Sequence, residues 1–126
     1  MNDKLKIRQT LDFDCGKQAT ELHASDFEGQ RLKNHATVPV LFIANWCFFC
    51  RSFHPQFEIA MKNKGIEWAV ADISDMDNPL WETFEISIVP SVIVFKNGEL
   101  VSRKDGVPGR GLSTRTIDEV IEELKQ

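Results

Sequence analysis

The chain has 126 residues and a formal net charge of −4, with 42% hydrophobic and 27% charged residues. This length suits one domain with a full apolar core, and the composition is ordinary for a globular protein in water. A negative net charge without a basic cluster argues against nucleic-acid binding, and no apolar run reaches the length that crosses a membrane.

Residues 1–19 are expected to form an N-terminal extension, and residues 20–126 the folded domain. The start of the extension carries basic residues but no apolar run behind them, so we expect no secretory signal. This favours a cytoplasmic protein in a reducing compartment, where a cysteine pair is more often catalytic than structural. Cys15 is interpreted as an idle thiol rather than a third redox group, because only Lys17 lies near it.

Two elements are predicted at the start of the domain. Ala19–His23 is predicted to be the first core strand. A short helix is predicted over Phe27–Asn34, since Ser25 and Glu28 have the spacing of a capping box.

The most informative stretch joins a predicted strand to a predicted helix. The apolar run Val38–Ile43 has the length and composition of a buried strand, and Ser52–Met61 has apolar residues at helical spacing. Cys47 therefore lies at a helix N-terminus, where free N–H groups and the helix dipole stabilise a thiolate. Cys50 follows one turn later, close enough for a disulfide. Such a pair is suited to thiol–disulfide exchange.

A structural zinc site is the alternative use of these cysteines. His54 follows on the same predicted helix, so a cluster of Cys47, Cys50 and His54 is sterically conceivable. Structural zinc sites usually show a second Cys-x-x-Cys or a pair of histidines, and neither is present. We therefore predict no metal.

The remaining elements alternate before the chain turns back on itself. Ile66–Ile73 predicts a buried strand, and Asn78 before Pro79 predicts the start of a short helix over Leu80–Phe84. Asn97-Gly98 between two apolar runs is a strong hairpin signal, because both turn residues need a positive φ.

The last predicted helix begins at about Ser113 or Thr116 and ends at Leu124. Its apolar residues recur on one face, which is expected to pack on the sheet. Strands that alternate with helices are expected to be parallel, whereas the hairpin strands are antiparallel, so the sheet is predicted to be mixed.

Three motifs together resemble the thioredoxin family. The first is Trp46–Cys50 with Pro55, the second is Ile88–Ser91, and the third is Phe95–Glu99 followed by Gly106. The resemblance spans about residues 20–126. It implies an α/β thioredoxin fold with a mixed five-stranded central sheet and helices on both faces.

The resemblance also implies a dithiol–disulfide oxidoreductase that reduces protein disulfides. Cys47 would be the attacking thiolate and Cys50 the resolving thiol, and the pair would cycle through a Cys47–Cys50 disulfide without any other cofactor. The implied partners are disulfide-containing proteins and an electron donor of the thioredoxin-reductase type. We expect a monomer.

The resemblance assigns further residues to substrate binding. Trp46 would shield the cysteine pair, and Val89 would offer backbone hydrogen bonds to an extended substrate segment. Pro90 would follow a cis peptide bond and lie against the disulfide. Gly106 would leave room for the substrate backbone. Phe48 is expected to be exposed beside the sulfur, as part of an apolar docking patch.

The chain departs from the family pattern in three places. Phe48-Phe49 stands between the cysteines where Gly-Pro is typical. Leu41 occupies the place of a buried acid, and Val70 the place of a lysine often found near it. The loop Val107–Gly111 is longer than usual and rich in glycine. These departures concern the redox potential, the proton route to Cys50 and the shape of the substrate groove.

Two other functions are compatible with the same motifs. One is a non-enzymatic binding module that uses its aromatic motif to hold a partner. The other is a disulfide isomerase or oxidase, although the basic or histidine-containing dipeptide usual in that class is missing. The presence of both Cys47 and Cys50 favours the reductase.

Overall fold

A computed structural model of the protein describes residues 19–125. The described part of the chain contains three α-helices and one turn of 3-10 helix: η1 (Ala24–Asp26), α1 (Phe48–Lys64), α2 (Leu80–Thr83) and α3 (Thr114–Leu124). Its strands are β1 (Thr20–Leu22), β2 (Phe27–Glu28), β3 (Arg31–Leu32), β4 (Val38–Ile43), β5 (Ala69–Asp72), β6 (Ser91–Lys96) and β7 (Glu99–Asp105). The predicted extension, with Cys15, lies outside the described residues except for Ala19.

The strands form one mixed sheet in the order β1-β5-β4-β6-β7-β3-β2. β4 is the third strand in this order, parallel to β5 and antiparallel to β6. β1 pairs with β5 in parallel at one edge. The sheet is mixed as predicted, but it has seven strands, so the prediction of five was wrong.

The additional strands come from the segment predicted to be a helix, Phe27–Asn34, which forms the β2–β3 hairpin instead. Gly29 lies in the turn with a φ of 59°, a conformation that glycine adopts without steric cost. Phe27 and Leu32 are paired across the hairpin and both are buried. Burial of these two side chains therefore outweighs the local helix signal. The predicted capping box of Ser25 and Glu28 does not form, because Glu28 lies in β2; the backbone N–H of His23 instead donates to the side chain of Asp26.

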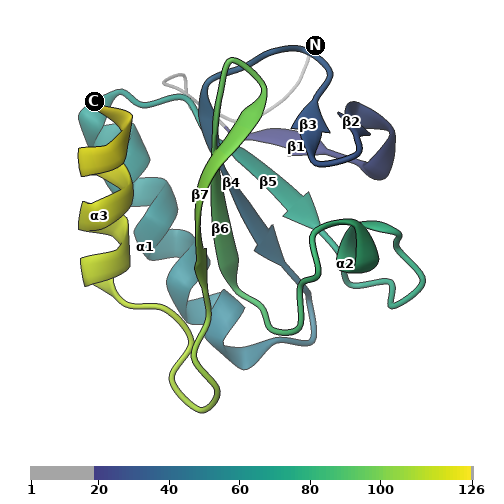
Figure 1. Cartoon of the computed structure of the whole chain (residues 1–126). Helices are drawn as coiled ribbons and strands as arrows, with labels where there is room; N and C mark the ends of the chain where they lie inside the picture. The colour runs from purple at the N-terminus through teal and green to yellow at the C-terminus, as the bar shows by residue number, and fades with distance from the viewer. Residues whose placement is uncertain (1–18, 126) are drawn as a thin grey trace, which may run out of the picture.

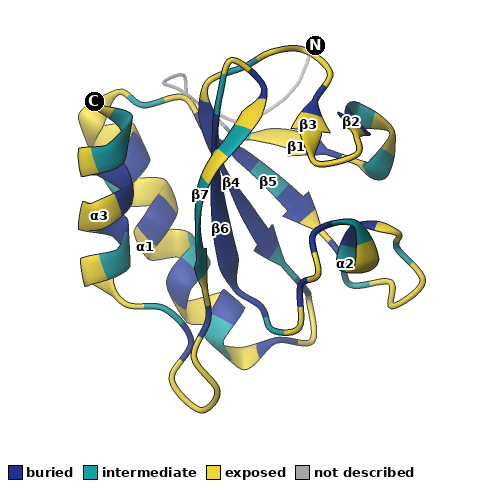
Figure 2. Ribbon diagram, viewed as in Figure 1, coloured by how far each residue is buried: buried dark blue, intermediate teal, exposed yellow. Residues whose placement is uncertain are grey.

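The sheet separates two apolar cores. Figure 1 shows that α1 and α3 cover one face of the sheet and that α2 lies on the other. Side chains alternate between the cores along each central strand, as expected for a period of two. On β4, Val40 and Phe42 pack on the α2 side, whereas Leu41 packs on the α1–α3 side. Figure 2 shows that β4 and β6 are buried along most of their length.

The predicted hairpin and helices after the motif are confirmed. Asn97 and Gly98 have φ values of 54° and 85° and connect β6 to β7. The side chain of Asn78 accepts a hydrogen bond from the N–H of Leu80 at the start of α2. No helix in residues 19–125 is both long enough and apolar enough to span a membrane.

Candidate active site

Cys47 and Cys50 lie where β4 passes into α1, as predicted. Cys47 is the N-cap residue of α1 in an extended conformation, and its N–H donates to the carbonyl oxygen of Ala44 at 3.2 Å. Cys50 is in the first turn of the helix. Both are free thiols in this structure. Cys47 is 7% exposed and Cys50 3%, so Cys47 is the more exposed of the two, as predicted, but only slightly.

The sulfur of Cys47 lies between two backbone groups. The N–H of Cys50 donates to Cys47 Sγ at 3.1 Å, which is the capping bond of α1. The thiol of Cys47 donates to the carbonyl oxygen of Val89 at 3.3 Å. One N–H of the helix start is thus aimed at the sulfur, as an anion at a helix N-terminus requires.

Cys50 is a poor acid in this environment. Burial raises the pKa of the Cys50 thiol to about 12, and the hydrogen bond and charge of Cys47 act in the same direction. The backbone at Ala44 opposes this shift and lowers the pKa, whereas the charge of Asp72 raises it slightly. Cys50 is therefore a protonated thiol at neutral pH.

The two positions where the family pattern has a buried acid and a lysine carry apolar side chains here. Leu41 and Val70 are register partners on β4 and β5, so the two apolar replacements noted in the sequence lie side by side. Leu41 is fully buried. Asp72 is exposed at the end of β5, where its carboxylate accepts hydrogen bonds from the N–H and the hydroxyl of Ser74. It caps a turn.

Trp46 is half exposed and held in place by two contacts. Its indole Nε1–H donates to the carbonyl oxygen of Ser74 at 2.9 Å. Its ring stacks on Trp81, with centroids 6.1 Å apart and an angle of 7° between the planes. Trp81 is in turn anchored by its Nε1–H, which donates to the carbonyl oxygen of Ile73 at 3.0 Å. No sequence pattern connects the two rings, because Trp81 comes from α2, far along the chain.

The Val89–Pro90 peptide bond is cis, as predicted. Val89 is buried, and its carbonyl oxygen is the acceptor for the Cys47 thiol. Gly106 is also buried and lies close to the loop that carries the cis peptide bond. A Cβ at Gly106 would lie 2.7 Å from the carbonyl oxygen of Pro90, so glycine is needed here for the close approach of this loop.

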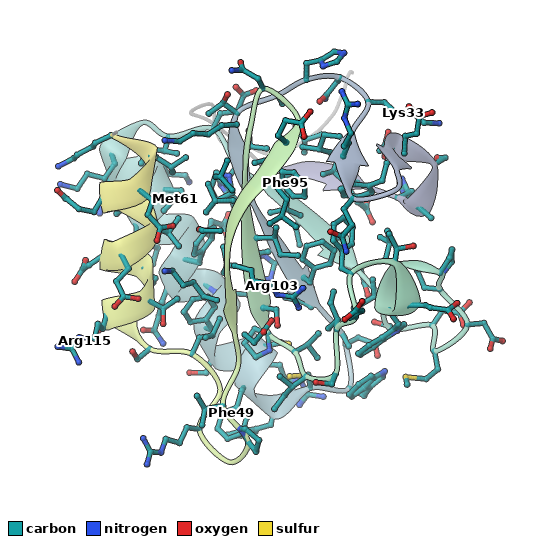
Figure 3. The ribbon with its side chains drawn as sticks, in the orientation of Figure 1. Lys33, Phe49, Met61, Phe95, Arg103 and Arg115 are labelled. Carbon is teal, nitrogen blue, oxygen red and sulfur yellow. The ribbon has the colours of Figure 1, made fainter. Side chains whose placement is uncertain are left out.

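The two phenylalanines between the cysteines have different surroundings. Phe48 is 73% exposed, as predicted, whereas Phe49 is partly buried. Their rings meet edge to face at 5.5 Å. Phe49 also contacts Gly111, where a Cβ would lie 2.7 Å from Cβ of Phe49. Figure 3 shows Phe49 against the loop that follows β7. No sequence pattern connects Phe49 with Gly111.

His54 does not join the cysteines. Its ring packs edge to face against Trp68, with centroids 5.8 Å apart. Within residues 19–125, no group of three or more histidine, cysteine, aspartate or glutamate side chains is placed to hold a metal ion.

Comparison with known proteins agrees with this geometry. The protein-family model named Thioredoxin matches residues 18–121. The chain belongs to the thioredoxin family.

Several members of this and related groups are similar to the chain. It is 30% identical over 121 residues to probable thioredoxin-2 of Caenorhabditis elegans, covering 94% of this chain and 81% of that protein. It is 28% identical over 113 residues to thioredoxin of Mycobacterium bovis, covering 88% and 97%. It is 35% identical over 99 residues to protein disulfide-isomerase A5 of Bos taurus, covering 75% of this chain but only 19% of that protein.

Among solved structures, thioredoxin f from spinach chloroplast superimposes with a TM-score of 0.68 at 19% identity, covering 92% of this chain and all of that one. This likeness shows the thioredoxin fold. Thioredoxins are disulfide oxidoreductases that act on disulfide-containing proteins, so membership of the family supports thiol–disulfide oxidoreductase activity in general.

Proposed function

We propose that the protein reduces disulfides in other proteins by dithiol–disulfide exchange through Cys47 and Cys50. The Cys47 thiolate attacks one sulfur of the substrate disulfide, and the other substrate sulfur leaves as a thiolate that takes up a proton. Cys50 then loses its proton and attacks Cys47. The products are a reduced substrate dithiol and a Cys47–Cys50 disulfide, so two electrons pass from the protein to its substrate.

The observation that supports this proposal best is the position of the Cys47 sulfur. It caps the start of α1 and accepts the Cys50 N–H at 3.1 Å. A negative sulfur is stabilised at such a position. Cys50 lies one helical turn away and its thiol is protonated at neutral pH, so we assign attack to Cys47 and resolution to Cys50.

The substrate is proposed to lie against the residues around Cys47. Trp46 and Phe48 are 52% and 73% exposed and provide an apolar surface beside the sulfur. Val89 would hydrogen-bond an extended substrate segment through its backbone, and Pro90 and Gly106 would hold the loop that carries it in place. The Cys47–Cys50 disulfide serves as the only redox centre in this proposal.

The proposal also includes an electron donor, an oligomeric state and a compartment. An electron donor of the thioredoxin-reductase type would return two electrons to the Cys47–Cys50 disulfide after each cycle. We propose a monomer that works in the cytoplasm, where a reducing environment keeps the pair available as a dithiol.

The test is reduction of insulin with dithiothreitol as the electron source, followed by precipitation of the freed B chain. The wild-type protein should accelerate precipitation, and Cys47→Ser should abolish the acceleration. An inactive wild type that still captures a partner would favour the binding-module alternative instead.

Isomerase activity is the second candidate, because the chain is 35% identical over 99 residues to bovine protein disulfide-isomerase A5. Reactivation of scrambled ribonuclease separates the two. An isomerase restores activity with catalytic amounts of protein, whereas a reductase mainly accumulates reduced ribonuclease.

A further inference from the structure

The segment Phe84–Ser91 connects α2 to β6 and carries the Val89 carbonyl that accepts the Cys47 thiol. Its backbone enters the left-handed region at Glu85, which has a φ of 50°. A residue other than glycine adopts such a φ at a steric cost, so contacts elsewhere must hold the segment in this shape.

One arginine holds the start of this segment. Nη1 of Arg103 on β7 donates to the carbonyl oxygen of Phe84 at 2.6 Å. Nε and Nη2 of the same guanidinium donate to Oδ1 of Asp105, at 3.2 and 2.9 Å. Figure 3 shows Arg103 between β7 and α2. Its side chain is only 29% exposed, so water competes only in part for these bonds.

Asp105 extends these contacts to the end of the segment. Asp105 and Ser91 are register partners, at the end of β7 and the start of β6. Ser91 is fully buried, and its hydroxyl donates to the carbonyl oxygen of Ile88 at 2.8 Å. The hydroxyl also lies 3.4 Å from Oδ1 of Asp105, the oxygen that accepts from Arg103. The contacts of Arg103, Asp105 and Ser91 thus form one polar network, which connects the two ends of the segment.

We propose that Arg103 is a positioning residue for disulfide exchange, which fixes the segment Phe84–Ser91 so that the Val89 carbonyl lies within hydrogen-bond distance of Cys47. A guanidinium suits this role because its planar fork offers donors in fixed directions, so one side chain can bond a carbonyl and a carboxylate at the same time. Arg103 acts through these partners rather than on the sulfur. This inference rests on the proposed function and adds to it a residue that sets the geometry of the attacking thiol.

Two variants break the network at different points. Arg103→Ala removes the donors to both partners, whereas Asp105→Ala leaves the bond to Phe84 and cuts the connection to the start of β6. Gln30→Ala is the matched control. Nε2 of Gln30 donates to the carbonyl oxygen of Thr83 at 2.9 Å, so its loss also frees a carbonyl at the end of α2 but leaves the network intact.

Infrared spectroscopy measures the contact directly, because a thiol that donates a hydrogen bond has its S–H stretching band at a lower wavenumber than a free thiol. All proteins in this experiment carry Cys15→Ser and Cys50→Ser, so that Cys47 alone contributes to the band. Both network variants should shift the band to higher wavenumber, and the control should leave it in place. A general loss of stability does not move this band while the protein stays folded.

The same substitutions, made with all cysteines in place, are assayed for reduction of insulin at a temperature where far-UV circular dichroism shows each protein to be folded. Arg103→Ala and Asp105→Ala should lower kcat/KM about tenfold, because a small misplacement of groups around the reacting atom slows a reaction even when the substitution lies elsewhere. Gln30→Ala should stay within about twofold of wild type.

The inference fails if either readout is unchanged in both network variants, or if Gln30→Ala shows the same changes as they do. If Arg103→Ala folds poorly, Asp105→Ala alone decides, since the Asp105 side chain is 50% exposed and its loss leaves the core intact. An active wild type with unaltered variants would overturn the inference alone. A wild-type protein that reduces no insulin would overturn the proposed function, and the inference with it.

Discussion

The thiol of Cys47 is hydrogen-bonded to the carbonyl oxygen of Val89, with 3.3 Å between Sγ and O. The two residues are far apart in the sequence, and the antiparallel pairing of β4 with β6 brings them together. The carbonyl that we propose for substrate binding is therefore already bonded to the attacking thiol. Loss of the Cys47 proton frees this acceptor for a substrate N–H.

The roles of the two cysteines predict opposite outcomes on substitution. Cys47→Ser should abolish turnover, because the attacking sulfur is gone. Cys50→Ser should accumulate mixed disulfides with substrate proteins, because the resolving attack is gone. The measurement is nonreducing electrophoresis after incubation with a disulfide-containing protein. Trapping by Cys47→Ser and not by Cys50→Ser would reverse the assignment.

The raised pKa of Cys50 predicts slow resolution at neutral pH. Burial, the main cause of that shift, persists in the mixed disulfide, whereas the hydrogen bond and charge of Cys47 are lost, so the pKa of Cys50 stays above its ordinary value there. Below that pKa the thiolate fraction rises about tenfold per pH unit, and the rate should rise with it. Stopped-flow decay of a Cys47 mixed disulfide measures this rate. A rate that is flat from pH 6 to 9 would show that another base serves Cys50.

Leu41→Asp tests the same proton route by adding a carboxyl group that could accept the Cys50 proton. Leu41 is fully buried in the core between the sheet and α1, and a carboxyl there costs about 1–3 kcal/mol if it is unpaired. The variant should therefore melt at a lower temperature. It should nevertheless resolve the mixed disulfide faster than wild type near pH 7, because the carboxylate can accept the Cys50 proton. Equal rates in both proteins would place position 41 out of reach of Cys50.

Phe48→Ser tests the apolar surface beside the sulfur. Phe48 is 73% exposed, so its loss should not disturb the core. We expect kcat/KM for insulin to fall about tenfold, equivalent to about 1.4 kcal/mol, with little change for a small disulfide. A parallel loss on both substrates would instead indicate an altered redox centre.

The Lys104–Glu123 ion pair predicts a pH-dependent contribution to stability. The ammonium of Lys104 on β7 lies 2.7 Å from the carboxylate of Glu123 on α3, and both side chains are about three-quarters buried, with 25% and 28% exposed. Burial raises the pKa of Glu123, but the hydrogen bonds from Lys104 and Ser102 outweigh it and hold the pKa below the ordinary 4.5. The stabilisation that the Glu123 carboxylate contributes to the fold is therefore present above pH 4.5. It is lost as the pH falls through the lowered pKa of Glu123.

Lys104 sets the alkaline limit of the stabilisation that this ion pair contributes. Its hydrogen bond to Glu123 raises the pKa above the ordinary 10.5, so the stabilisation is complete below that value and lost as the pH rises through the raised pKa. Glu123→Gln should lower the free energy of unfolding by about 1 kcal/mol at pH 7 and by less at pH 3. Urea titration measures both. Glu122→Gln on the exposed side of α3 is the control and should change little.

Much of the fold follows from local patterns that the tertiary structure does not alter. The run Val38–Ile43 is too apolar to be anything but a buried strand, and Asn97-Gly98 has the positive φ values that its turn requires. The spacing of the cysteines relative to that strand places Cys47 at a helix start. These features depend on neighbours in the chain, and for that reason the sequence alone predicts them.

Other features depend on contacts between distant segments. Phe27–Asn34 has a local helix signal, but Phe27 and Leu32 gain more by pairing across a hairpin at the edge of the sheet. The Trp46–Trp81 stack and the contact of Phe49 with Gly111 join segments that no periodicity connects. The sequence by itself determined the strand, the helix start and the two cysteines. The tertiary structure decided which carbonyl bonds to Cys47, how buried Cys50 is and what stands beside Phe49, because burial and packing are set only when the whole chain folds.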